Sequence, residues 1–120
     1  MKIVVTLMIA TLLAGCGKGE WQTKDISGLM PELRFELTND SGERVTADDY
    51  DGYVKLVFFG FSNCPDICPT TLAQLASVVR KRPEAKRDQV RVLFVSVDPN
   101  RDTVQRLDQY TDAFGDFVIG

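Results

Sequence analysis

The sequence contains no histidine, and this absence limits the metal sites that it can form. The remaining soft ligands are the thiols of Cys16, Cys64 and Cys68. Structural zinc sites and iron–sulfur clusters need more ligands than Cys64 and Cys68 alone supply. Copper(I) is a soft ion that accepts two or three ligands, so it is the metal that the ligand count excludes least.

An excess of basic residues and a long apolar run are also absent. The 120 residues, enough for one small domain, carry 14 Lys and Arg against 17 Asp and Glu, a net charge of −3. Nucleic-acid binding favours a basic face, so we expect no nucleic-acid partner. The apolar run at residues 3–13 is too short to cross a bilayer, which takes about 20 residues.

The N-terminus follows the pattern of a bacterial secretory signal, with a positive charge ahead of the apolar run at 3–13. The run ends in Leu13-Ala14-Gly15-Cys16, which resembles a lipobox. This resemblance implies cleavage before Cys16 and diacylation of its thiol; the alternative is an ordinary signal peptide that contains a cysteine. We expect residues 1–15 to be a signal peptide and residues 16–32 a lipidated tether. The protein is then anchored in the bacterial cell envelope and faces the periplasm.

Residues 33–120 begin with a pattern typical of a β-hairpin. Apolar and charged residues alternate at 33–38, a turn cluster follows at 39–42, and residues 44–46 can return as the second arm. Residues 54–61 are nearly continuous in apolar side chains, which predicts a central strand covered on both faces.

The remaining patterns alternate between helix and strand. Apolar residues recur at helical spacing after Cys68, and Pro83 ends this helix. Residues 90–97 predict a second buried strand, and a further helix is expected from Asp102 or Thr103, either of which can be its cap, to about residue 113. The strand–helix–strand order implies a parallel crossover and hence an α/β domain.

The two thiols of this domain lie where one strand gives way to a helix. Ligands of open α/β sheets bind outside the carboxyl ends of the strands, and Cys64 and Asp98 follow adjacent strands. Cys68 is expected near the first turn of the helix, where thiol pKa values fall and reactivity rises. The pair can bind a soft metal, act as a redox couple or form a plain stabilising disulfide.

Two separated motifs resemble the Sco/SenC copper-delivery family. Residues Phe59-Gly60-Phe61-Ser62-Asn63-Cys64-Pro65-Asp66-Ile67-Cys68-Pro69 are similar to that family's signature. Residues Val95-Ser96-Val97-Asp98-Pro99-Asn100-Arg101-Asp102-Thr103 are similar to its second conserved block. The hairpin fits the start of the family's domain, so the resemblance covers about residues 33–120. It implies a thioredoxin-like fold that is incomplete at the C-terminus.

The resemblance also implies a function, a cofactor and partners. A membrane-tethered protein would bind a copper ion through Cys64, Cys68 and a downstream histidine, and would help assemble the copper centre of cytochrome c oxidase. The expected partners are the oxidase subunit that carries this centre, thiol reductants and the membrane. Asp66 and Asp98 are candidates for supporting the ligands, with loop or helix capping as their alternative roles.

The family's histidine lies beyond residue 120, so we expect a C-terminally truncated member with two thirds of the ligand set. Two alternatives to copper delivery stay open. A periplasmic thiol–disulfide oxidoreductase would use Cys64 and Cys68, although three residues separate them where the usual redox motif has two. An inactive remnant is the other alternative. The pattern favours a metallochaperone over an enzyme.

Overall fold

The computed structural model describes residues 23–120, of which those up to Glu32 belong to one compact unit and Leu33–Gly120 form a second. The predicted signal peptide and the lipobox cysteine lie outside the described residues. In the described portion of the first part, the Leu29 N–H donates to the Ile26 carbonyl at 2.9 Å and closes a turn. Within residues 23–120, no helix is long and apolar enough to cross a membrane.

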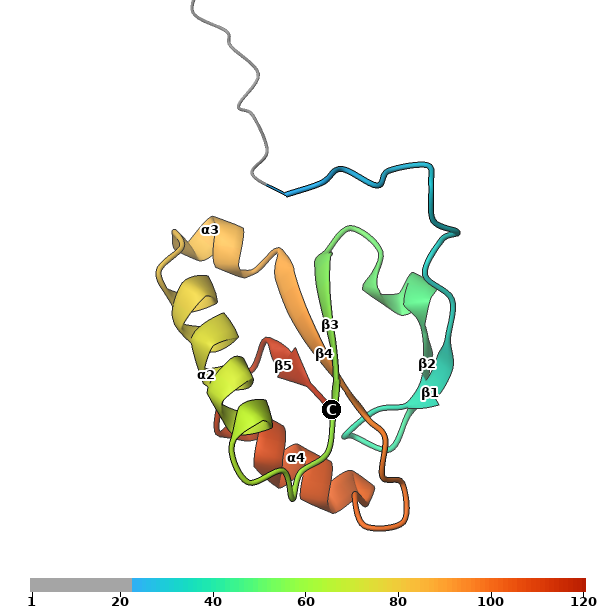
Figure 1. The fold of residues 1–120 in the computed structure, drawn as a ribbon, viewed down its shortest axis with the longest axis vertical. Coiled ribbons are helices and arrows are strands. Elements are labelled where there is room, and N and C mark those ends of the chain that lie inside the picture. Colours follow the sequence, from blue (N-terminus) through green and yellow to red (C-terminus); the bar gives the residue numbers. More distant parts are fainter. Residues whose placement is uncertain (1–22) are drawn as a thin grey trace, which may run out of the picture. The chain divides into compact units, whose positions relative to one another are not determined.

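The second part begins with the predicted hairpin, which is confirmed (Figure 1). Strands β1 (Glu36–Thr38) and β2 (Arg44–Thr46) pair antiparallel, with Leu37 opposite Val45. The Asn39 side chain accepts hydrogen bonds from two backbone N–H groups of the turn and so fixes it. A short 3-10 helix, η1 (Ala47–Tyr50), follows the hairpin.

Three parallel strands form the sheet, β3 (Val54–Gly60), β4 (Val90–Ser96) and β5 (Val118–Ile119). Their order is β3-β4-β5, so the prediction that residues 54–61 form a central strand is wrong: among the described strands, β3 lies at an edge and β4 at the centre. An apolar run indicates burial but not neighbours. The exposed side chains of Val54 and Phe59 show that β3 is covered less completely than the run suggested.

The sheet is packed against helices α2 (Ile67–Arg80) and α4 (Val104–Asp112), and the short helix α3 (Glu84–Arg87) joins α2 to β4. Helix α2 ends before Pro83, as predicted, but α3 was not expected. The buried core is formed by side chains of α2, β4, α4, β5 and the residue before β5. They are Leu72, Ala76, Val79, Val92, Phe94, Leu107, Phe117 and Val118.

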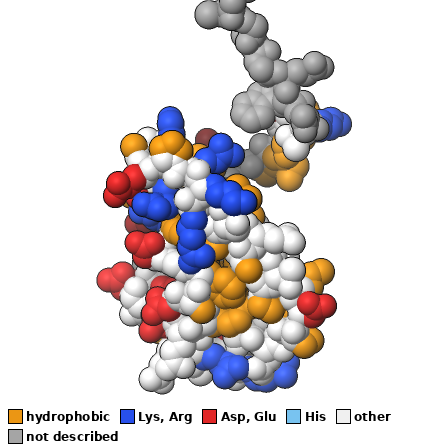
Figure 2. Space-filling view, turned by 90° about the vertical axis from the view of Figure 1, so that its left-hand side faces the viewer, with side chains coloured by type: hydrophobic (Ala, Val, Ile, Leu, Met, Phe, Trp, Pro, Cys, Tyr) orange, Lys and Arg blue, Asp and Glu red, His pale blue; other side chains and the backbone are white. Residues whose placement is uncertain are grey.

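Basic side chains are concentrated at the C-terminal end of α2, in the two residues that follow it and in α3; they are Arg80, Lys81, Arg82, Lys86 and Arg87. In Figure 2, Lys and Arg side chains gather toward one end of the visible face. Cations are favourable at a helix C-terminus, where the backbone carbonyls concentrate negative charge. Arg80 also donates to the carbonyl of residue 114 at 2.6 Å, so this guanidinium ties α2 to the segment that follows α4.

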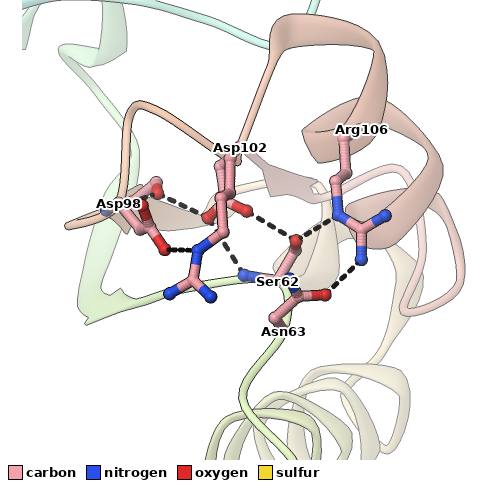
Figure 3. Close-up of polar contacts among 7 residues, drawn as sticks. Ser62, Asn63, Asp98, Asp102 and Arg106 are labelled. Carbon is pink, nitrogen blue, oxygen red and sulfur yellow. Dashed lines mark hydrogen bonds and ion pairs between the residues drawn. The ribbon is translucent and has the colours of Figure 1, made fainter.

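Asp102 joins three segments at the carboxyl end of the strands (Figure 3). Its carboxylate accepts from the Ser62 N–H at 3.0 Å, the Ser62 hydroxyl at 2.5 Å and the Ser96 hydroxyl at 2.5 Å. Burial raises the pKa of Asp102, but these hydrogen bonds and the charge of Arg106 outweigh burial and hold the pKa below its usual value. The helix cap of α4 is Thr103, one of the two predicted residues.

We expect Asp102 to make folding stability sensitive to acid. Because its pKa is lower in the folded protein than in the unfolded chain, its contribution is complete above about pH 4 and is lost as the pH falls through the folded value. Asp102→Asn should lower the free energy of unfolding at pH 7 by about 1–3 kcal/mol and weaken this acid dependence.

Urea unfolding between pH 7 and pH 3 measures both effects. Asp108→Asn removes an exposed carboxylate from α4 and is the matched control, which should unfold like the wild type. An Asp102→Asn protein that loses stability with acid as steeply as the wild type would contradict the assignment.

Candidate functional site

The two thiols lie at the junction between β3 and α2, as predicted. The Cys64 N–H donates to the Phe61 carbonyl at 3.1 Å and closes a turn directly after β3. Cys68 lies in the first turn of α2, and its N–H points at the Cys64 sulfur with an N–S distance of 3.3 Å. Both are free cysteines, and only 8% and 4% of their surfaces are exposed.

The surroundings shift the pKa values of the two thiols in opposite directions. A hydrogen bond from the Cys68 thiol lowers the pKa of Cys64, assisted by backbone N–H groups of residues 66–68 at the start of α2. Burial raises the pKa of Cys68, so the fall expected for a thiol at a helix start is found at Cys64 and not at Cys68. Donation of its proton to Cys64 favours the protonated form of Cys68 further. Cys64 is therefore the better thiolate, and the Cys68 proton stabilises that charge.

Cys68 is held tightly because Gly60 has no side chain. A Cβ atom at Gly60 would lie 2.6 Å from the Phe94 ring and 3.1 Å from the Cys68 sulfur. The sulfur therefore packs directly against the last residue of β3, beside the apolar core. Since Cys68 also belongs to a regular helix, its position is fixed from two sides.

The two carboxylates proposed to support the ligands have separate local contacts. Asp66 is the residue before α2; its carbonyl accepts from the Thr70 N–H at 3.1 Å, and its carboxylate is exposed. Asp98 forms an ion pair with Arg101 at 2.5 Å, and its N–H donates to the Ser96 hydroxyl. The support of either carboxylate for the thiols stays a prediction.

Two residues of this region were not recognised as site residues in the sequence. Asp102 was expected only as a helix cap, and Arg106 lies on the exposed side of α4. Arg106 donates to the Ser62 hydroxyl at 2.7 Å and to the Asn63 side-chain carbonyl (Figure 3). The contacts of Asp102 and Arg106 with Ser62 join positions 40 and 44 residues apart, which no local pattern reveals. The polar residues within the two motifs, such as Ser62 and Asp102, indicated that these segments could form hydrogen bonds, but not with which partners.

The donor set suits a soft ion with few ligands. Within residues 23–120, no group of three or more His, Cys, Asp or Glu side chains could hold a metal ion. The two sulfurs are close neighbours, one of them is disposed to ionise, and both are shielded from water. Such a pair fits copper(I), which thiolates prefer, and does not fit a structural zinc ion.

Comparison with known proteins places this site in a family. The SCO1/SenC family matches residues 27–120. The Arabidopsis thaliana protein SCO1 homolog 1, mitochondrial, is 43% identical over 86 residues, which are 72% of this chain and 26% of that protein. An SCO2-like protein of Rickettsia prowazekii is 41% identical over 80 residues, 67% of this chain and 38% of that protein. The chain thus spans well under half the length of these relatives.

Solved structures agree with the sequence relatives. Arabidopsis thaliana ScoI with copper bound superposes with a TM-score of 0.67 at 42% identity, covering 73% of this chain and 55% of that one. BsSco, in which a disulfide switch has been identified, gives a TM-score of 0.54 at 31% identity and covers 68% and 46%. The predicted thioredoxin-like fold is confirmed by these neighbours. The chain belongs to the SCO1/SenC family.

Proposed function

We propose that this chain binds copper(I) through Cys64 and Cys68 and takes part in delivering copper to the copper centre of cytochrome c oxidase. The observation that carries the proposal is the pair of neighbouring, buried thiols at the start of α2. Solved relatives from Arabidopsis thaliana, Bradyrhizobium japonicum and yeast have copper bound. BsSco is a member of a family of cytochrome c oxidase assembly proteins, which supports the oxidase as the destination.

The chain's own residues account for how a copper(I) ion would be held and released. Cys64 loses its proton more readily because its pKa is lowered, and Cys68 would give up its proton as the metal binds. The Cys68 sulfur packs against Gly60, and the residue is only 4% exposed, so little water reaches it. A pair of ligands leaves room in the ion's coordination shell, so an acceptor's thiols or imidazoles can enter before the chain lets go.

We also propose that the protein works at a membrane surface. The sequence Leu13-Ala14-Gly15-Cys16 supports acylation of Cys16, and residues 16–32 are long enough to serve as a tether. Acylation of this kind anchors a domain stably when at least two chains are attached. The working compartment would then be the periplasm, where thiol reductants are needed to keep Cys64 and Cys68 reduced.

The first test of this function is copper retention. Reduced protein is loaded with copper(I), mixed with a chromophoric copper(I) chelator and desalted. It should keep about one copper(I) per chain, because soft thiolates compete well for this ion. The Cys64→Ser, Cys68→Ser double variant should retain almost none, and Cys16→Ser, which leaves both thiols intact, should retain as much as the wild type. A wild-type protein that gives up its copper as readily as the double variant would refute copper binding.

Thiol–disulfide exchange is a second candidate function, favoured by the opposite pKa shifts of Cys64 and Cys68. An insulin-reduction assay in excess dithiothreitol separates the two. We expect the rate to stay at the dithiothreitol background, because three residues rather than two separate the thiols. Turnover well above that background, lost in Cys64→Ser, would instead establish an oxidoreductase.

A further inference from the structure

Arg106 holds the two residues that come directly before Cys64. Its Nε donates to the Ser62 hydroxyl at 2.7 Å, and a terminal nitrogen donates to the Asn63 side-chain carbonyl at 2.5 Å (Figure 3). A guanidinium is a rigid planar fork, so two such bonds fix both the position and the direction of the segment that they grip. Helix α4 thereby holds a loop that lies 43 and 44 positions earlier in the sequence.

Ser62 is held from its other side as well. Its hydroxyl donates to the Asp102 carboxylate at 2.5 Å while accepting from Arg106. The Asp102 bonds are partly buried and support the fold, whereas the Arg106 bonds are exposed. Removal of Arg106 should therefore loosen the loop without unfolding the domain.

The position of Cys64 relative to Cys68 depends on the loop between β3 and α2. Cys68 is fixed by α2, by Gly60 and by the packing around Phe94. Cys64 lies in the connection between β3 and α2, outside any helix or strand. Movement of the loop, residues 61–66, would therefore change the distance between the two sulfurs.

We propose that Arg106 is a positioning residue that sets the separation of the Cys64 and Cys68 sulfurs by clamping the loop at Ser62 and Asn63. This inference deepens the proposed copper site and rests on it, but the separation of two sulfurs can be measured without any metal. A clamp that holds the sulfurs together raises the effective concentration of one thiol at the other.

The test is the equilibrium of the purified protein with glutathione. Two protein thiols and one oxidised glutathione give one protein disulfide and two reduced glutathione molecules, so electrons and protons balance. In Arg106→Gln, the equilibrium constant for disulfide formation should fall by roughly two- to fivefold, the effect expected of exposed charge-assisted bonds. Copper(I) affinity, measured by chelator competition, should fall by a similar factor.

Two control variants separate geometry from charge. Arg101→Gln removes a positive charge at the same end of the sheet, but its partner is Asp98 rather than the loop, so its glutathione equilibrium should match the wild type. Arg106→Lys keeps the charge and loses the fork, so it should behave like Arg106→Gln. Wild-type behaviour of Arg106→Gln or Arg106→Lys, or an equal fall in Arg101→Gln, would overturn the positioning role.

Thermal unfolding of each variant shows whether the domain itself has weakened. A fall in the glutathione equilibrium of Arg106→Gln at an unchanged unfolding midpoint supports the clamp, and a fall that only follows a lower midpoint overturns it. The two proposals fail separately. If the wild type retains no copper while the glutathione equilibrium responds as expected, copper binding is refuted and the clamp stands.

Discussion

Burial of the Asp102 carboxylate is the constraint on which the thiol end of the sheet depends. An ionised carboxylate is costly to remove from water unless hydrogen-bond donors surround it. Here the donors come from Ser62, two residues after β3, and from the last residue of β4, while Asp102 itself precedes α4. The hydrogen bonds that stabilise this one carboxylate therefore bring together the loop that carries Cys64, the end of β4 and the segment before α4.

The site built on this anchor combines a rigid half with a softer half. Cys68 is part of α2, is almost fully buried and packs against Gly60, so its thiol is held in one position. Cys64 accepts hydrogen bonds and sits in a loop, which suits a group that must exchange partners. The same asymmetry would suit both proposed functions, copper(I) transfer and thiol exchange, and this explains why one pair of cysteines suggests both. The ligand chemistry and the copper-bound relatives favour transfer.

The local parts of this structure could be predicted from the sequence, and the contacts between distant parts could not. Turn residues and periodicity were enough to identify the hairpin, α2, β4 and α4, and the strand–helix junction located both thiols. The order of the strands was missed because an apolar run such as that of β3 does not specify its neighbours. Helix α3 is a single short turn without a period. Asp102 and Arg106 act through partners that no window of sequence contains.

The span of the Ser62–Asp102 contact, 40 positions, also says when the site forms. A chain is made from its N-terminus, and contacts between distant residues close later than local ones. The helix that carries Cys68 can form early, but the Cys64 loop is not held by Asp102 until the segment around residue 102 has packed against it. Until then the Cys64 and Cys68 sulfurs lack the burial that they have in the folded domain. Because oxidation of a thiol follows its exposure, completion of the fold is itself what protects the pair.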